Sequence, residues 1–244
     1  MRPTPPAAIS PTSNRMRRHV VANNDWLASA SAWVNQAAAE ALATRGEFHL
    51  VLAGGSTPEK LYRALSSQEQ DWAHWHIWFG DERCLPIDDP QRNSRMAAAA
   101  WLDRVTIPDS QIHIIPAEQG AEAAAMAYSR ELIGREAFDL VLLGLGQDGH
   151  TASLFPHHAW GSDIHAPDAM PVLDAPKPPS MRVTLSARRL SHARNVLFLV
   201  SGADKRDALR QWQQGAIIPA SAIQPDIGID LLIDADACPS GEPK

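Results

Sequence analysis

The stretch FDLVLLGLGQDGHTASLFP, residues 138–156, decides the fold, because a buried strand changes there into a glycine-rich loop. Its apolar run, residues 140–143, is short and bounded closely by glycine, which predicts a fully buried strand. Three glycines and two ionisable side chains follow at once: Gly144, Gly146, Asp148, Gly149 and His150. Because glycine lets other atoms approach the backbone closely, this cluster predicts a loop shaped around a ligand.

The same glycines spell G-x-G-x-x-G, the pattern of a dinucleotide-binding loop, but their surroundings do not fit that function. Such a loop requires a long helix directly after the glycines and an acidic residue about 20 positions later, at the end of the next strand. Here Pro156 stops any helix early, and Asp163 and Asp168 lie in a proline-rich stretch. We therefore expect no dinucleotide and interpret the loop as one that presents His150.

Composition limits the classes of partner. The chain has 244 residues, enough for one large α/β domain, and its 45% hydrophobic and 20% charged residues are typical of a soluble globular enzyme. No apolar run approaches the roughly 18 residues of a membrane span, so no membrane contact is expected. The net charge of −6 and the lack of a basic block beyond Arg15, Arg17 and Arg18 argue against nucleic-acid binding.

The ends of the chain and the cysteines suggest a simple organisation. Residues 1–18 are expected to be a disordered tail, because the first 14 are rich in Pro and Ser and lack the apolar core of a signal peptide. Residues 19–244 are then a single α/β catalytic domain. Cys84 and Cys238 stand far apart in the sequence, which argues against a disulfide framework and favours the cytoplasm. The oligomeric state is left open, with a monomer as the expectation.

A second informative stretch follows the predicted strand at residues 48–53. The strand runs into a turn with a helix start: Gly54, Gly55, Ser56, Thr57 and Pro58. Thr57 is a suitable N-cap and Pro58 a suitable first helical residue. Unpaired N–H groups and the helix dipole would both point at an anion in this turn. Phosphate binding is favoured over a tight turn that needs glycine for geometry alone, and the absence of a P-loop motif argues against a nucleotide triphosphate.

Two further predicted strands also end in glycine and charge. Residues 76–79 are followed by Gly80, Asp81, Glu82 and Arg83, which belong either to a site or to a solvated turn. Residues 196–200 lead into a helix start at which Ser201 and Asp204 match a capping box. Lys205 falls in the first turn of that helix, where a cation opposes the helix dipole unless an anion is bound in front of it. An exposed, tolerated lysine is the alternative.

Alternating strands and helices along the chain predict the fold class. We expect an α/β, modified Rossmann-like fold with a mostly parallel sheet covered by helices on both faces, in which ligands bind beyond the carboxyl ends of the strands. The four glycine-rich turns should then share one rim. Residues 157–179 contain five prolines and should form an irregular connection, a candidate flap over the site with a short strand near Val172. The other expected strands are residues 112–115, 181–185 and 227–233, and the other expected helices begin near residue 26, at Asn93 and at residue 121.

Metal chemistry is not predicted. His74 with His76, and His157 with His158, have no third and fourth ligand at a suitable spacing. Cys84 follows the Asp-Glu-Arg turn, but a nucleophilic role would need a partner histidine, so we treat it as incidental.

Taken together, these segments resemble the 6-phosphogluconolactonase family. The most specific element is the run from Asp148 to Pro156, DGHTASLFP, and the likeness extends from about residue 26 to residue 234. The other matching elements occur in the family's order: Gly54-Gly55-Ser56-Thr57-Pro58, Gly80-Asp81-Glu82-Arg83, Asn93-Ser94-Arg95-Met96, Ser201-Gly202-x-x-Lys205 and Pro219-Ala220-Ser221. The resemblance implies a cofactor-free hydrolase of the pentose phosphate pathway that opens 6-phospho-D-glucono-1,5-lactone to 6-phosphogluconate.

The resemblance also suggests a mechanism of hydrolysis and the residues that carry it out. We hypothesise that His150 is the general base that activates water, since an imidazole titrates near neutral pH. Asp148 or Asp81 is expected to orient it. The phosphate of the substrate is expected to bind to the glycine turn and to basic side chains near it. These substrate-binding residues are Gly54, Gly55, Ser56, Thr57, Arg83, Arg182 and Lys205.

Two alternative functions have less support from the sequence. A glucosamine-6-phosphate deaminase or isomerase of the same fold would carry a glutamate shortly after the histidine, whereas residues 153–156 are Ser-Leu-Phe-Pro. Arg83 also stands where those deaminases have an aromatic residue. A sugar-phosphate sensor domain of a transcriptional regulator should carry a basic helix-turn-helix module, and the short N-terminal segment leaves no room for one.

Overall fold

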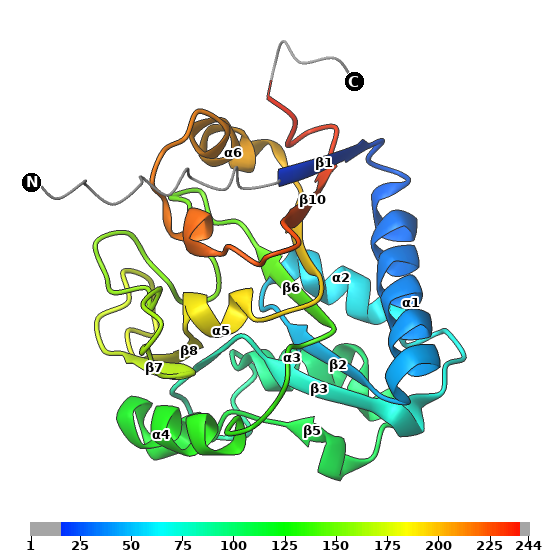
Figure 1. Cartoon of the computed structure of the whole chain (residues 1–244), viewed down its shortest axis with the longest axis vertical. Helices are drawn as coiled ribbons and strands as arrows, with labels where there is room; N and C mark the ends of the chain where they lie inside the picture. The colour runs from blue at the N-terminus through cyan, green and yellow to red at the C-terminus, as the bar shows by residue number, and fades with distance from the viewer. Residues whose placement is uncertain (1–15, 240–244) are drawn as a thin grey trace, which may run out of the picture.

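Seven strands form one parallel sheet in the computed structural model, which describes residues 16–239. The strand order is β1-β10-β9-β6-β2-β3-β5, and every neighbouring pair runs parallel. In Figure 1 the sheet extends from β1 and β10 in the upper part of the view, through β6 and β2, to β3 and β5 in the lower part. Their bounds are β1 Met16–Val21, β2 Phe48–Leu52, β3 Trp75–Phe79, β5 Ile112–His113, β6 Leu140–Gly144, β9 Val196–Val200 and β10 Ile229–Asp234.

A second, smaller sheet is antiparallel and has the order β4-β8-β7. Its strands are β4 Asp81–Arg83, β7 Ala169–Val172 and β8 Arg182–Leu185. β4 comes directly after β3, so this sheet extends from the carboxyl edge of the large one. The short strand expected near Val172 is confirmed as β7. The strand expected at residues 181–185 is also present, but it belongs to this second sheet, which the sequence did not predict.

Helices cover both sheets. α1 and α2 contact strands of the large sheet, α2 packs against α3, and α4 lies on β7 and β8. The α-helices are α1 Trp26–Arg45, α2 Ser56–Leu65, α3 Asn93–Ala100, α4 Ala121–Glu131, α5 Ala187–Ser191 and α6 Arg206–Gln213. Short 3-10 turns are η1 Trp72–His74, η2 Leu102–Arg104, η3 Asp109–Gln111, η4 Ala117–Gln119, η5 Ala203–Lys205 and η6 Pro219–Ala222. The predicted fold class, a mostly parallel sheet with helices on both faces, is confirmed.

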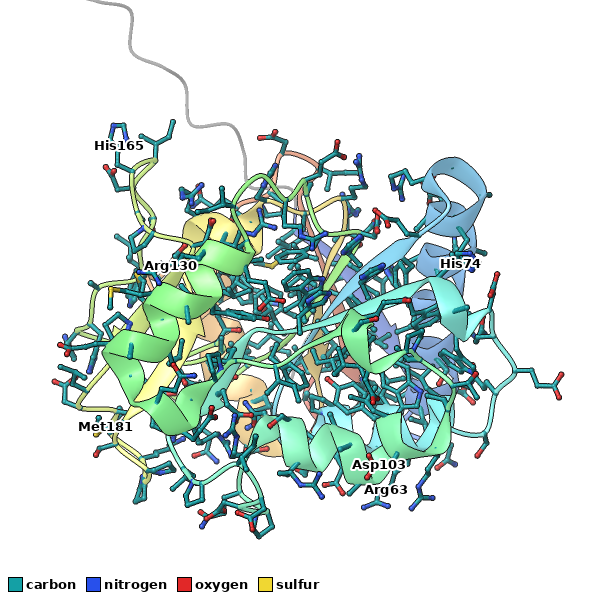
Figure 2. All side chains as sticks on the ribbon, turned by 90° about the horizontal axis from the view of Figure 1, so that it is seen from below. Arg63, His74, Asp103, Arg130, His165 and Met181 are labelled. Carbon is teal, nitrogen blue, oxygen red and sulfur yellow. The ribbon has the colours of Figure 1, made fainter. Side chains whose placement is uncertain are left out.

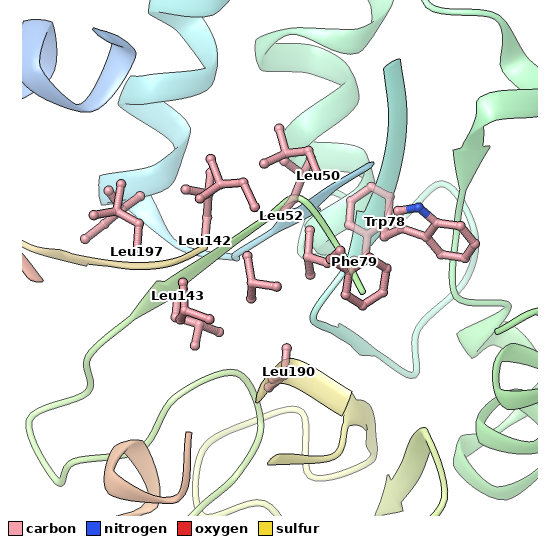
Figure 3. Close-up of a cluster of buried hydrophobic side chains, with 14 of the residues drawn as sticks. Leu50, Leu52, Trp78, Phe79, Leu142, Leu143, Leu190 and Leu197 are labelled. Atoms are coloured by element: carbon pink, nitrogen blue, oxygen red, sulfur yellow. The ribbon is translucent and has the colours of Figure 1, made fainter. Parts of the chain in front are cut away.

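The apolar runs form the core because both faces of the large sheet are covered. All five residues of β9 are buried, as are Leu140 to Leu143 of β6. Figure 3 shows Leu142 and Leu197 on one side of the sheet, and Leu143 with Leu190 of α5 on the other. Charged and polar side chains such as Arg63, Arg130 and His165 project from the periphery instead (Figure 2). Continuous hydrophobic runs are typical of such doubly covered parallel strands.

The N-terminal boundary predicted from the sequence is wrong by three residues. Residues 1–15 of the predicted tail lie outside the described part of the chain, but Met16–Val21 forms the edge strand β1. This strand pairs with β10, and the guanidinium of Arg17 contacts the buried carboxylate of Asp230 at 2.6 Å and 2.8 Å. His19 contacts the same carboxylate at 2.8 Å. The strand forms because of these tertiary contacts, which no local pattern reveals.

Two helix starts also differ from the prediction. α2 begins at Ser56 with Gly55 as N-cap, instead of at Pro58 with Thr57 as N-cap. The predicted capping box at Ser201 is wrong, because its hydroxyl donates to Asp234 at 2.6 Å, whereas Asp204 pairs with Lys205. The carboxylate of Asp234 in β10 has thus taken the Ser201 hydroxyl that would form the local cap.

Some expectations remain predictions. Within residues 16–239, no helix combines the length and the apolar character that crossing a membrane requires. Cys84 and Cys238 are both free. The cytoplasmic location, the organisation as a single domain and the monomeric state remain predictions.

The buried carboxylate of Glu82 holds the second sheet against the rest of the fold. Its oxygens accept the backbone N–H groups of Arg83 at 2.8 Å, Asn93 at 2.7 Å and Ser94 at 2.8 Å. The guanidinium of Arg92, also fully buried, lies 3.5 Å away. A carboxylate at the first N–H groups of α3 satisfies donors that have no partner within the helix and favours the helix dipole.

Replacing Glu82 by Gln should lower the free energy of unfolding by about 1–3 kcal/mol, because one backbone N–H group would face an amide donor and Arg92 would keep only Glu118, at 2.9 Å, as a counter-charge. Chemical denaturation measures this change. Glu69→Gln, at an exposed position, is the matched control and should change stability by less than about 0.5 kcal/mol. A Glu82→Gln variant as stable as the control would contradict this role.

Candidate active site

Four strands of the large sheet end at one cavity of about 260 Å³. Gly54 to Pro58 line it after β2, Gly80 and Asp81 after β3, Gly144 to Gln147 after β6, and Lys205 after β9. His150 also lines it. The predicted common rim of the four glycine-rich turns is thereby confirmed. Because all strands are parallel, their carboxyl ends meet at the same edge of the sheet.

His150 is held by the neighbouring carboxylate. Its Nδ1 lies in a short contact with Oδ1 of Asp148, and its backbone N–H donates to the same oxygen at 3.3 Å. Asp148 does not line the cavity and supports the imidazole from behind, whereas Asp81 makes no contact with His150 among the described residues. Of Asp148 and Asp81, the two acids expected to orient His150, only Asp148 forms a hydrogen bond with the imidazole ring among the described residues. The imidazole therefore turns Nε2 away from Asp148.

The contact with His150 lowers the pKa of the Asp148 carboxyl. Burial raises the pKa of its carboxyl, but the hydrogen bond and the charge of His150 outweigh burial and hold the pKa below its ordinary value. Asp148 is therefore ionised near neutral pH. A carboxylate at Nδ1 keeps the ring in the tautomer with a proton on Nδ1, which leaves a lone pair on Nε2.

Gly146 makes room for the pair. A Cβ atom at this position would lie 2.0 Å from Nδ1 of His150 and 2.7 Å from Oδ1 of Asp148. Gly149 has a φ of +79°, and its backbone N–H donates to the carbonyl of Gly146 at 3.0 Å, closing the turn. Gly146 therefore leaves the space that the histidine and its acid occupy.

Asp81 joins three segments of the rim. Its Oδ1 accepts from Nδ2 of Asn93 at 2.9 Å, and its Oδ2 accepts from the hydroxyl of Ser153 at 2.6 Å. Asn93 in turn lies against Gly54, where a Cβ atom would be 2.1 Å from the amide oxygen of Asn93. Asp81, Asn93 and Ser153 are all buried. Gly54 is thus required by a close approach, and Asp81 connects the strand ends of β2, β3 and β6.

The start of α2 presents donors to the cavity. Gly55, Ser56 and Thr57 line it, and the first intrahelical bond is donated by Glu59 to the carbonyl of Gly55 at 3.1 Å. The N–H groups before Glu59 have no acceptor within the helix, and the positive end of the helix dipole lies at the same place. This geometry suits an anionic group.

Lys205 follows β9, whereas α2 follows β2, and β6 lies between these two strands in the sheet. Nζ of Lys205 contacts Oδ2 of Asp204 at 2.8 Å, and the same oxygen accepts from Nε2 of Gln147 at 2.9 Å. The hydrogen bond from Lys205 lowers the pKa of Asp204. Gln147 precedes Asp148 in the loop, so this contact links the lysine to the segment that carries the histidine.

The two arginines predicted to bind phosphate both line the cavity but already have protein partners. Nη1 of Arg83 donates to the carbonyl of Gln91 at 2.5 Å, while its Nε is buried without a partner within residues 16–239. Arg182 donates through Nε and Nη2 to carbonyls of the proline-rich segment. Burial lowers the pKa of Arg182.

The cavity gathers nearly all the residues singled out from the sequence and adds others. Of the predicted site residues, only Asp148 stands outside the lining. Residues that the sequence did not single out for the site also line it: Asn93, Gln147, Thr151 and Lys177. Lys177 comes from the proline-rich segment expected as a flap. The buried hydroxyl of Thr151 has no hydrogen-bond partner among the described residues.

A group of residues that could ligate a metal lies elsewhere, near the beginning of β2 and β3. His49 and His76 are cross-strand partners, and Glu47 contacts Nε2 of His49 at 3.1 Å and Nε2 of His76 at 3.7 Å. The indole of Trp78 donates to Nδ1 of His49 at 3.1 Å. A neutral His49 therefore carries its proton on Nε2 and donates it to Glu47, which occupies the nitrogen that a metal would need.

The sheet and its cavity define a class: an α/β protein with a helix N-terminus suited to an anion and a histidine–aspartate pair at one rim. The family model for glucosamine-6-phosphate isomerases/6-phosphogluconolactonase matches residues 22–231. The chain therefore belongs to this family.

Individual relatives agree with this assignment. A protein named 6-phosphogluconolactonase from Synechocystis sp. is 41% identical over 214 residues, which cover 81% of this chain and 86% of the relative. One of the same name from Mycobacterium tuberculosis is 38% identical with the same coverage. The crystal structure of 6-phosphogluconolactonase from Thermotoga maritima superposes with a TM-score of 0.84 at 26% identity, covering 90% of this chain and all of that one.

His76 should make the stability of the fold sensitive to acid. Burial, followed by the charge of His49, lowers the pKa of His76 from 6.5 to about 4. A histidine with a depressed pKa binds its proton more readily in the unfolded chain, so stability should fall as the pH drops from 6.5 toward 4. His76→Gln should lose less stability over this interval than the wild type.

The free energy of unfolding at about pH 7 and about pH 4.5 measures the difference. His165→Gln removes an exposed histidine and should leave the wild-type pH dependence unchanged. An equal loss of stability in His76→Gln and the wild type would contradict the role of His76.

Proposed function

We propose that this chain hydrolyses 6-phospho-D-glucono-1,5-lactone to 6-phospho-D-gluconate, a step of the pentose phosphate pathway. The observation that carries the proposal is the His150–Asp148 pair on a cavity that also contains the N-terminus of α2 and Lys205. Relatives named 6-phosphogluconolactonase, at 41% and 38% identity, support the same assignment. The cavity thus offers a base and an anion site to one small molecule.

His150 is the proposed general base. Asp148 accepts a hydrogen bond from the N–H at Nδ1, so Nε2 takes a proton from water as the water oxygen bonds to C1 of the lactone. The carbonyl electrons move to the carbonyl oxygen and form an alkoxide. When that alkoxide collapses, the bond between C1 and the ring oxygen breaks, and the ring oxygen takes the proton from the imidazolium. The resulting carboxylic acid ionises at neutral pH.

The phosphate is proposed to lie at the start of α2. The N–H groups of Gly55, Ser56 and Thr57 precede the first intrahelical hydrogen bond, and Lys205 supplies positive charge on the same cavity. Lys205 keeps its contact with Asp204, which limits the positions of its ammonium. A phosphate held there fixes the distance of the lactone from His150.

The amino-sugar deaminase alternative has less support. That reaction moves protons between carbon atoms and would use an additional carboxylate in the loop after the histidine. The loop here has Ser153, whose hydroxyl donates to Asp81 at 2.6 Å, and no acidic residue up to Pro156. Hydrolysis needs only the base and the water.

Replacing His150 by Asn should lower kcat by roughly 10²-fold or more, the usual contribution of general base catalysis. Acid release from freshly prepared 6-phosphogluconolactone, corrected for spontaneous hydrolysis, measures the rate. Circular dichroism should show that the variant is folded. Wild-type turnover in a folded His150→Asn variant would remove His150 from the mechanism.

Lys205→Ala should raise KM by roughly 10-fold to 100-fold, since a hydrogen bond between charged groups contributes about 1.5–3 kcal/mol. Its kcat should change little if the lysine binds the phosphate equally in the ground state and the transition state. Arg210→Ala, on the exposed face of α6, is the matched control and should keep the wild-type KM. An unchanged KM in Lys205→Ala would exclude Lys205 from the phosphate site.

A further inference from the structure

The basic side chains that line the cavity differ in their protein partners. Lys205 pairs with Asp204, Arg83 donates to the carbonyl of Gln91, and Arg182 donates to backbone carbonyls. Among residues 16–239, no group pairs with the ammonium of Lys177, which is exposed and lines the cavity. A cation without a protein partner can bind an anionic group without breaking an existing contact. Lys177 is therefore the basic side chain most available to a ligand.

The backbone of Lys177 is nevertheless held in place. Nη2 of the buried Arg182 donates to the carbonyls of Lys177 at 2.9 Å and Pro178 at 3.3 Å, and its Nε donates to that of Pro179 at 3.0 Å. The N–H of Ala175 donates to the carbonyl of Ser180 at 2.9 Å and closes the loop. One guanidinium thus satisfies three consecutive carbonyls that could not pair in a regular strand.

The same guanidinium connects this loop to the histidine. Its central carbon lies 5.5 Å from the centre of the Phe155 ring, and that ring is 5.0 Å from the ring of His150. Phe155 is fully buried, so these contacts keep a defined spacing. The loop that carries Lys177 is thereby connected, through Arg182 and Phe155, to the histidine that lines the same cavity. The start of α2 and Lys205 belong to the large sheet.

We propose that Lys177 contacts the lactone carbonyl oxygen and stabilises the negative charge that forms there, and that Arg182 is a positioning residue for Lys177. The proposal rests on the lactonase function proposed above. When water adds to C1 and its proton passes to Nε2 of His150, the carbonyl electrons become an alkoxide beside the ammonium of Lys177. When the bond between C1 and the ring oxygen breaks, the electron pair on the alkoxide re-forms the carbonyl, and the ring oxygen takes the proton from the imidazolium of His150, so Lys177 takes no part in the proton transfer.

Charge at the carbonyl oxygen exists only during the reaction, so the expected effect is on kcat. Lys177→Ala should lower kcat by about 10²-fold, as removal of one oxyanion donor does, with KM changed less than about threefold. Lys177→Arg keeps the charge and should recover part of kcat. Lys60→Ala removes an exposed lysine of α2 outside the cavity and should match the wild type.

Arg182 is tested through its dependence on Lys177. Arg182→Met should lower kcat, and the double variant with Lys177→Ala should be no slower than Lys177→Ala alone, because both changes remove one interaction. Additive losses would overturn the positioning role. If Arg182→Met does not fold, the Lys177 variants still decide the role of the lysine.

Each result with Lys177 has one meaning. A wild-type protein without lactonase activity refutes the proposed function and the role of Lys177 with it. An active wild type with a Lys177→Ala variant as fast as Lys60→Ala refutes only the role of Lys177. A raised KM with unchanged kcat would place Lys177 at the phosphate and overturn its assignment to the carbonyl.

Discussion

The carboxylate of Asp81 joins three of the four strand ends at the cavity, those of β2, β3 and β6. It accepts hydrogen bonds from Asn93 at 2.9 Å and from Ser153 at 2.6 Å, and Asn93 packs against the backbone of Gly54. These contacts hold the turn before α2, the start of α3 and the histidine loop at fixed distances from one another. Because Asp81 is 5% exposed, the hydrogen bonds form away from water, where leaving either partner unsatisfied is costly.

Around this connection the two sheets contribute different chemistry. The large parallel sheet delivers the start of α2, the His150–Asp148 pair and Lys205 at its carboxyl edge. The small antiparallel sheet delivers Arg83 and Arg182, which are directly paired in its register. Arg182 then fixes the loop that carries Lys177. In the proposed reaction, the large sheet holds the phosphate and the base, and the small sheet holds the charge that develops on the carbonyl oxygen.

Much of this could be predicted because it depends on local sequence. The apolar run of β6 and the glycines after it identify a buried strand with a ligand loop, and Gly55 to Pro58 identify a helix start suited to an anion. What could not be predicted depends on contacts between distant segments. β1 forms because Arg17 and His19 contact the carboxylate of Asp230. The expected capping box of Ser201 and Asp204 does not form, because the Ser201 hydroxyl donates to Asp234 of β10. Arginine is a residue type that often binds phosphate, yet Nε and Nη2 of Arg182 donate to backbone carbonyls of the proline-rich loop.

In the proposed reaction, a base and a phosphate site act together on a lactone. One measurement tests it most directly: acid and ammonia release by the same preparation, given freshly generated 6-phosphogluconolactone and glucosamine 6-phosphate in parallel, each corrected for the uncatalysed rate. We expect accelerated acid release from the lactone and no ammonia from the amino sugar. Ammonia release without acceleration of lactone hydrolysis would contradict it.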